Sequence, residues 1–153
     1  MSQREQVAMT AEEAAAMLAG SSKLHLATIN RDGTVHLVAM YYAMLDGRIA
    51  FWTYRSSQKA RNLARDPRVT CLVEAGEEYF DLRGVQVVGT ARCVEEPAGV
   101  LDIGRRIAAR MGGVPAEALE DYVTHAARKR LGYIVEPDRV ISWDHRKLLP
   151  PAG

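Results

Sequence analysis

The sequence predicts a mainly β domain, an antiparallel barrel of about six to seven strands with flanking helices. Short apolar runs recur along the chain, and hairpin turns such as Asn30–Gly33 and Asp46-Gly47 separate them. Gly84 and Gly89 interrupt the longest run, and glycines allow the bends and bulges with which barrels close. The 153 residues fit one domain, 1–153, with enough apolar side chains for a core.

The first regular element is a helix that begins after Thr10. Thr10 and Glu13 form a capping box, in which each side chain bonds to the backbone of the other residue. Good helix formers follow up to Leu18, and Gly20 is a typical helix end. Residues 1–9 before this helix and residues 147–153 at the other end are expected to be irregular tails.

The strands follow in closely spaced groups. The expected ranges are 24–29, 34–45, 48–53, 69–74, 79–94, 131–135 and 140–143, the last two separated by turn residues 136–139. Short turns between neighbours make the pairing antiparallel. A helical insert interrupts the series after Glu96, with one apolar stripe ending near Met111 and a second helix opening at Pro115.

The stretch from Phe51 to Val69 joins a strand to a short basic helix. Ser56 or Ser57 can cap the helix, and Asp66-Pro67 ends it because proline disfavours helical geometry in the residue before it. The segment is basic: its cations are Arg55, Lys59, Arg61, Arg65 and Arg68. Serine, cations and free N–H groups at a helix start can seat a phosphate. A capped, solvated surface helix is the alternative, and the spacing alone favours it slightly.

Composition excludes several classes of protein. A net charge of +1 gives no general case for binding nucleic acid or a membrane surface. No run is long enough to span a bilayer, the N-terminus lacks a signal peptide, and Cys71 and Cys93 suit a reducing cytoplasm. The four histidines lie far apart, so we expect no metal site, and neither a nucleophile elbow nor a glycine-rich phosphate loop occurs.

Three segments in order carry a family resemblance. Residues 27–36 resemble the opening hairpin of the pyridoxamine 5′-phosphate oxidase-like split β-barrels, which have a Greek-key fold. Residues 57–69 are similar to the cofactor-phosphate segment of that family. Within them, Lys59 and Asn62 look like the Lys-x-x-Asn element of the subgroup that uses the deazaflavin coenzyme F420. Residues 87–91 resemble the long strand that follows.

The resemblance implies a homodimer with cofactor clefts between two barrels. In this family the strand-to-helix turn holds the phosphate, which corresponds here to Thr53, Arg55, Ser57, Lys59, Arg61 and Asn62. The ring system lies along the second strand, corresponding to Val38, Ala39, Met40 and Tyr41, and many relatives have proline at the position of Ala39. Trp143 could approach the partner's cofactor, but packing alone also explains a tryptophan there.

The implied activity is an F420-dependent reductase that transfers a hydride from the reduced deazaflavin to an enone, quinone or tetrapyrrole. An FMN-dependent oxidase or reductase, and a non-catalytic flavin or tetrapyrrole carrier, are the alternatives. The catalytic residue is open: Tyr41, Tyr42, His36 or water could supply a proton. If Lys59 and Asn62 line a solvated cleft, replacing either should weaken cofactor binding with little effect on folding stability.

Overall fold

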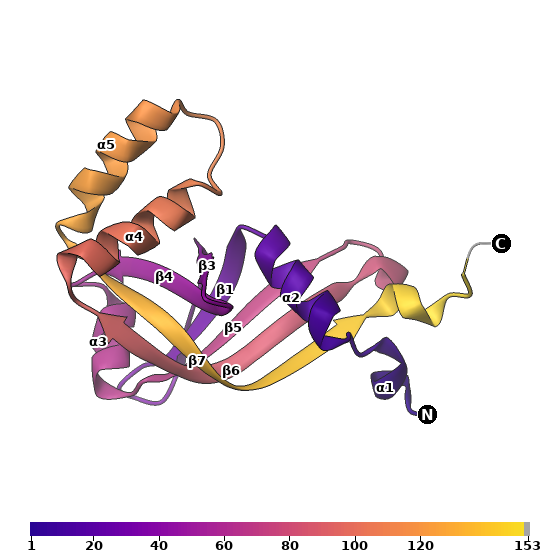
Figure 1. The fold of residues 1–153 in the computed structure, drawn as a ribbon. Helices are drawn as coiled ribbons and strands as arrows, with labels where there is room; N and C mark the ends of the chain where they lie inside the picture. Colours follow the sequence, from indigo (N-terminus) through magenta and orange to yellow (C-terminus); the bar gives the residue numbers. More distant parts are fainter. Residues whose placement is uncertain (152–153) are drawn as a thin grey trace.

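Residues 1–151 of the computed structural model are described, and they contain one curled, seven-stranded antiparallel sheet (Figure 1). The hydrogen-bonding order is β2-β1-β5-β6-β7-β4-β3. The strands are β1 (Lys23–Ile29), β2 (Val35–Tyr41), β3 (Ala43–Leu45), β4 (Arg48–Tyr54), β5 (Arg68–Ala75), β6 (Arg83–Val94) and β7 (Arg130–Asp144). The predicted mainly β, antiparallel fold with flanking helices is confirmed.

The two ends of the sheet are neighbours in the sequence. β2 and β3 replace the single strand expected at residues 34–45, and Tyr42 lies between them. The backbone N–H of Tyr42 still donates to the carbonyl of Ser22, just before β1, at 3.1 Å, and its buried hydroxyl donates to the carbonyl of Leu18. Because only one residue joins the two edge strands β2 and β3, the sheet curls back on itself, as a split barrel does.

The last strand is longer than predicted. Residues 136–139 were expected to be a turn, but β7 runs unbroken from Arg130 to Asp144. Its register against β6 shifts between Val88 and Gly89, opposite Pro137. Proline has no N–H to donate, so it is accommodated where a bulge interrupts the ladder. A Cβ on Gly89 would lie 2.1 Å from the Glu136 carbonyl oxygen, so glycine allows this approach, as predicted for a bulge.

The strand expected at residues 79–94 begins later, at Arg83. The short 3-10 helix η1 (Tyr79–Asp81) precedes it. Gly84 lies in regular register, and its missing side chain leaves room for Trp143, whose Cζ2 would lie 2.4 Å from an added Cβ. The glycine therefore serves packing here and not a bend.

The long helices follow their sequence signals. They are α2 (Ala11–Gly20), α3 (Gln58–Arg65), α4 (Pro97–Ala108) and α5 (Ala116–Ala127). The Thr10–Glu13 capping box is present at α2, and Pro97 opens α4. α4 and α5 form a hairpin that stands on one side of the curled sheet (Figure 1).

The chain ends are more ordered than the predicted tails, and the expectation of irregular residues 1–9 and 147–153 is wrong in part. α1 (Gln3–Val7) and η2 (His145–Leu148) form short helices that pack against each other. Lys147 Nζ donates to the Ala8 carbonyl at 3.1 Å and pairs with Glu13 at 2.7 Å. These tertiary bonds fix segments that have little local signal; residues 152–153 lie outside the described residues.

Two apolar clusters form the interior. The larger fills the barrel with side chains such as Leu26, Phe51 and Val85, all fully buried. The smaller lies where α4 packs on the outer side of the sheet, with Val100 and Ile103 at 1% exposure. Burial of such side chains contributes about 1.5–3 kcal/mol each. Among residues 1–151, no helix is long and apolar enough to cross a membrane.

Candidate functional site

The start of α3 has the cap that the sequence predicted. Ser57 is the N-cap, and its hydroxyl oxygen accepts from the amide of Ala60 at 3.1 Å. The Thr53 hydroxyl, at the end of β4, donates to the same oxygen at 3.1 Å. Strand end and helix start are thereby fixed to each other, and Lys59 in the first helical turn is placed beside β4.

A cavity of about 320 Å³ opens next to this turn, and we call it the first cavity. Its walls come from β2, β4, α3, the α4–α5 hairpin and the start of β7. The lining residues are Met40, Tyr41, Trp52, Thr53, Tyr54, Lys59, Gly104, Ile107, Ala108, Met111, Tyr122, Val123 and Arg130. A concave, mostly apolar site of this size with a few polar groups is typical of small-molecule binding.

Lys59 is one of two cations in the first cavity. Its side chain is half-buried, and burial lowers the pKa of the Lys59 ammonium because desolvation disfavours the charged form. Within residues 1–151, no carboxylate lies within 4.0 Å of it. An anion bound next to Lys59 would stabilise the charged ammonium that burial destabilises.

Arg130 is the second cation, and its guanidinium group lies against two aromatic rings. Its guanidinium carbon lies 4.9 Å from the Trp52 ring centroid and 4.1 Å from that of Tyr54. Trp52 and Tyr54 lie two residues apart on β4 and so face the same side, and Tyr54 pairs in register with Arg130. A guanidinium fixed by stacking presents its N–H groups in a set geometry, which suits phosphate or carboxylate oxygens.

The α4–α5 hairpin supplies the apolar wall. Trp52 fits against α4 because residue 104 is glycine: an added Cβ would lie 2.4 Å from the ring. Ile107 and Val123 are buried, whereas Tyr122 is 49% exposed at the edge. The wall has no acidic residue among the described lining, so the first cavity combines apolar surface with two unneutralised cations. This arrangement fits a flat ligand with anionic substituents.

The family follows from comparison of the whole chain. A sequence profile of pyridoxamine 5′-phosphate oxidase matches residues 10–144. The chain belongs to this family. The matched residues include all seven strands of the sheet. The resemblance seen in three short segments of the sequence therefore extends over the whole sheet.

Solved structures of similar proteins differ in what they are known to do. The conserved hypothetical protein Rv2991 of Mycobacterium tuberculosis is 42% identical, with a TM-score of 0.89, over 100% of this chain and 96% of its own. An F420 reductase is 25% identical, with a TM-score of 0.60, over 82% of this chain and 93% of its own. The haem storage protein HutZ of Vibrio cholerae, at 16% identity and a TM-score of 0.65 over 86% and 94%, shares the fold. Among curated proteins, none matches this chain.

The cofactor-binding residues that the oxidase-family resemblance implied lie in several places. Four of them line the first cavity: Met40, Tyr41, Thr53 and Lys59. Arg55 lines a different cavity, and Arg61 is exposed on α3. Val38 packs against the main core, and Ala39 faces outward on β2. The binding roles of all ten stay predictions.

Within the predicted phosphate-binding segment, the environment of Asn62 differs most from the prediction. The prediction of a small effect on folding stability assumed a solvated cleft, but Asn62 is fully buried. Its amide nitrogen donates to Thr28 at 3.1 Å and to Asn30 at 2.9 Å, and its oxygen accepts from Gln58 at 2.8 Å. Because these bonds tie α3 to β1, Asn62 stabilises the fold beneath the site.

The candidate proton donors lie in different parts of the structure. Tyr41 lies at the edge of the first cavity, with 39% of its surface exposed. Tyr42 is buried, and burial raises the pKa of its hydroxyl, which is bound to Leu18. His36 lies in a separate hollow beside the β1–β2 turn, where its Nδ1 has no hydrogen-bond partner among residues 1–151. Trp143 packs on Gly84, away from the cavity. Tyr41 alone of these side chains contacts the first cavity.

Sequence reasoning missed the parts of the site that come from distant elements. Arg130 and Trp52 had no motif to mark them, and Tyr122 looked like an ordinary helix residue. The one local signal was the pair of aromatic residues at 52 and 54 on one face of a strand. Among residues 1–151, no group of three His, Cys, Asp or Glu could hold a metal ion.

Proposed function

We propose that this chain is a coenzyme F420-dependent reductase. It transfers a hydride from the reduced deazaflavin to a conjugated acceptor such as an enone, a quinone or a tetrapyrrole. The observation that carries the proposal is the first cavity, in which Lys59 and Arg130 lie beside apolar surface with no carboxylate. This donor set fits a planar ring with an anionic side chain, and the 25% identical F420 reductase supports the same choice.

Each wall of the first cavity has a role in this proposal. Lys59 binds the phosphate of the coenzyme next to Thr53 and the capped start of α3, and Arg130 binds a second anionic oxygen. Met40 and Tyr41 lie along the ring, and the α4–α5 hairpin excludes water. When bound, the coenzyme supplies the hydride chemistry, so the protein has to bind, orient and shield.

A second copy of the chain completes the site in this proposal. The outer face of β2 exposes apolar side chains: Val35 is 62% exposed, Leu37 64% and Tyr41 39%. Exposed apolar stripes of this kind mark protein interfaces. Tyr41 belongs both to this stripe and to the first cavity, so a partner packed on β2 contacts the cavity edge. Light scattering should give a dimer mass, and a stable monomer with bound coenzyme would contradict it.

We place the protein in the cytoplasm as a single domain. Cys71 and Cys93 are both free thiols, which suits a reducing compartment. Burial raises the pKa of Cys71 to about 12, so this cysteine behaves as a small apolar core residue.

Cofactor titration tests the proposal directly. Coenzyme F420 and FMN are titrated separately into the wild type, Lys59→Ala and Arg106→Ala, at fixed salt. Removing a charge-assisted bond costs about 1.5–3 kcal/mol, so Lys59→Ala should bind F420 about tenfold to a hundredfold more weakly. Arg106→Ala is the control, because it removes an exposed cation of α4 that is neither among the predicted cofactor-binding residues nor in the first cavity, and it should bind normally.

The outcomes separate the alternatives. Preferential FMN binding that depends on Lys59 favours the FMN-dependent oxidase or reductase. Tight binding without turnover of any quinone or enone favours a carrier. Unchanged F420 affinity in Lys59→Ala would falsify the phosphate site.

A further inference from the structure

A second cavity, of about 360 Å³, lies between the start of α4 and the end of α5. Its lining residues are Arg55, Glu95, Pro97, Val100, Leu101, Thr124, Ala127 and Arg128. None of the described residues lines both this cavity and the first one. The two cavities are therefore separate, and of the predicted cofactor-binding residues only Arg55 lines the second one.

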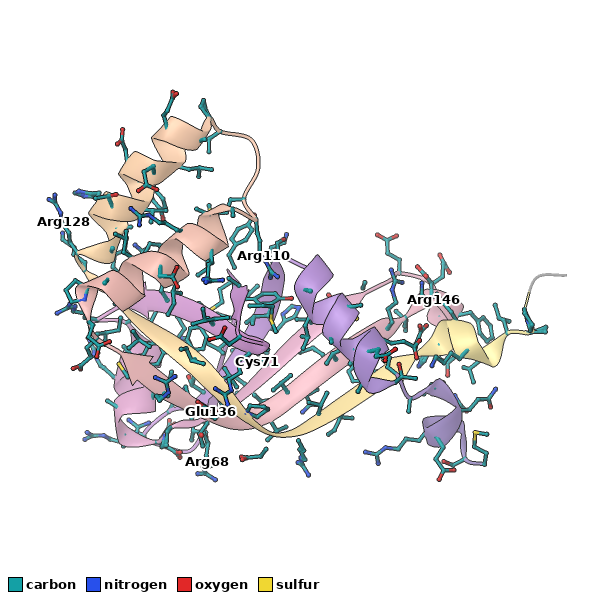
Figure 2. The ribbon with its side chains drawn as sticks, viewed as in Figure 1. Arg68, Cys71, Arg110, Arg128, Glu136 and Arg146 are labelled. Carbon is teal, nitrogen blue, oxygen red and sulfur yellow. The ribbon has the colours of Figure 1, made fainter. Side chains whose placement is uncertain are left out.

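The floor and the rim of the second cavity differ in chemistry. The floor is apolar: Val100 is 1% exposed, and Leu101 and Ala127 are partly buried. Arg55 and Arg128 lie on the exposed rim, and Figure 2 shows Arg128 at the end of α5. A ligand would thus place its apolar body inward and its polar group at the rim.

The rim has a net positive charge. Two arginines face one carboxylate, that of Glu95, which leaves one positive charge. Within residues 1–151, neither arginine has a carboxylate within 4.0 Å. The backbone N–H of Arg55 donates to the Lys129 carbonyl at 3.0 Å, so the strand and helix ends that carry the arginines are held together.

We infer that the second cavity binds an apolar monoanion, a carboxylic acid with an aryl or hydrocarbon body. The apolar floor takes the body, and the guanidinium groups of Arg55 and Arg128 bind the carboxylate. A cavity of this volume has room for a compact ligand. The inference does not rest on the proposed reductase activity, because the cavity is separate from the first one. Arg55 is also a predicted phosphate-binding residue, so the test uses Arg128 and Leu101 instead.

A charge series with one common body tests the inference. Nuclear magnetic resonance titrations of the coenzyme-free protein use 3-phenylpropionate, the neutral 3-phenylpropanamide and the cationic 3-phenylpropylamine. The acid should bind about tenfold more tightly than the amide, and the amine most weakly. Arg128→Gln should weaken the acid about tenfold, and Leu101→Trp, which fills the cavity from a partly exposed position, should abolish binding.

Two control variants locate the acid. Arg106→Gln removes an exposed cation of α4 that pairs with Asp102 and lines neither cavity, so it should leave the affinity unchanged. Lys59→Ala should also leave it unchanged. The inference is overturned if no acid binds, if the amide binds as well as the acid, or if Arg128→Gln has no effect. Weakening by Lys59→Ala alone would place the acid in the first cavity. F420 titration of Arg128→Gln tests the reductase proposal separately.

Discussion

The two ends of the molecule use basic side chains in opposite ways. At the end with both termini, Arg146 lies 2.8 Å from Asp144 and Lys147 lies 2.7 Å from Glu13 (Figure 2). In the first cavity, at the other end of the sheet, the cations have aromatic or apolar neighbours and no acidic partner. The same residue types are therefore structural at one end and available for a ligand at the other.

The pKa shifts show the same difference. The hydrogen bond from Arg146 lowers the pKa of Asp144, so pairing stabilises the charged form there. Burial lowers the pKa of Lys59, so the environment of the first cavity destabilises its charged form. A cation that the fold disfavours is a candidate for function, because structural pairing does not explain it.

The largest expected effect concerns the buried hydrogen-bond network around Asn62. Asn62→Ala leaves Thr28, Asn30 and Gln58 without their buried partner, so the free energy of unfolding should fall by about 2–3 kcal/mol. Chemical denaturation measures it, with Lys59→Ala as the unpaired comparison in the same helix. Equal stability of Asn62→Ala and the wild type would mean that the network is not structural.

The next effect tests the aromatic side of the first cavity. Gly104→Ala pushes a methyl group into Trp52 and should lower the free energy of unfolding by about 1–3 kcal/mol. Because Trp52 holds Arg130, F420 binding should weaken as well. Gly112→Ala is the matched control, since an added Cβ there meets no atom within 4 Å and its φ is not positive. If both variants behave alike, the Trp52 contact does not shape the site.

A smaller effect compares paired with unpaired charges directly. Asp144→Asn removes the carboxylate charge from the Arg146 pair and should lower the free energy of unfolding by about 1 kcal/mol, since Arg146 is solvent-exposed. Lys59→Met removes a desolvated charge and should not lower it. Thermal or urea unfolding of both variants at neutral pH gives the answer. If Lys59→Met lost more stability than Asp144→Asn, Lys59 would be the structural cation and the contrast between the two ends of the molecule would be wrong.

The smallest effect is a difference in pH dependence. Lys59 and Asp144 both have lowered pKa values in the folded protein, so in each case the unfolded chain binds more protons between the two values. Stability should therefore rise with pH in two windows, just below about 10.4 for Lys59 and just below about 3.9 for Asp144. Lys59→Met should flatten the alkaline window alone, and Asp144→Asn the acidic one. Unchanged slopes in unfolding curves across pH would contradict the assigned causes.

Local signals predicted the elements well. The capping box at Thr10 and the cap at Ser57 are bonds between residues three apart, so the sequence alone specifies them. Pro137 misled the prediction, because a proline usually ends a strand. Its tolerance here depends on the shift at Gly89, a residue of another strand.

The candidate site was less predictable because its contacts are long-range. Lys59 could be chosen from its place after a serine cap, but Arg130 reaches Tyr54 only because β7 pairs with β4. Cofactor binding by Asn62 stays a prediction, but its burial was not foreseen, because its partner Thr28 lies 34 residues away. A single sequence does not reveal which polar side chain a distant strand will bury.

The place of β7 in the sheet has a consequence for how the chain folds during synthesis. β7 lies between β6 and β4, although it is the last strand to be made. Until residues 130–144 leave the ribosome, one edge of β4 and one edge of β6 stay unpaired. The α4–α5 hairpin, which lies between β6 and β7 in the sequence, then has no closed sheet beneath it. Pairings between such distant segments are slow to form. A nascent chain that stops before β7 therefore has two additional unpaired strand edges, and its first cavity lacks Arg130.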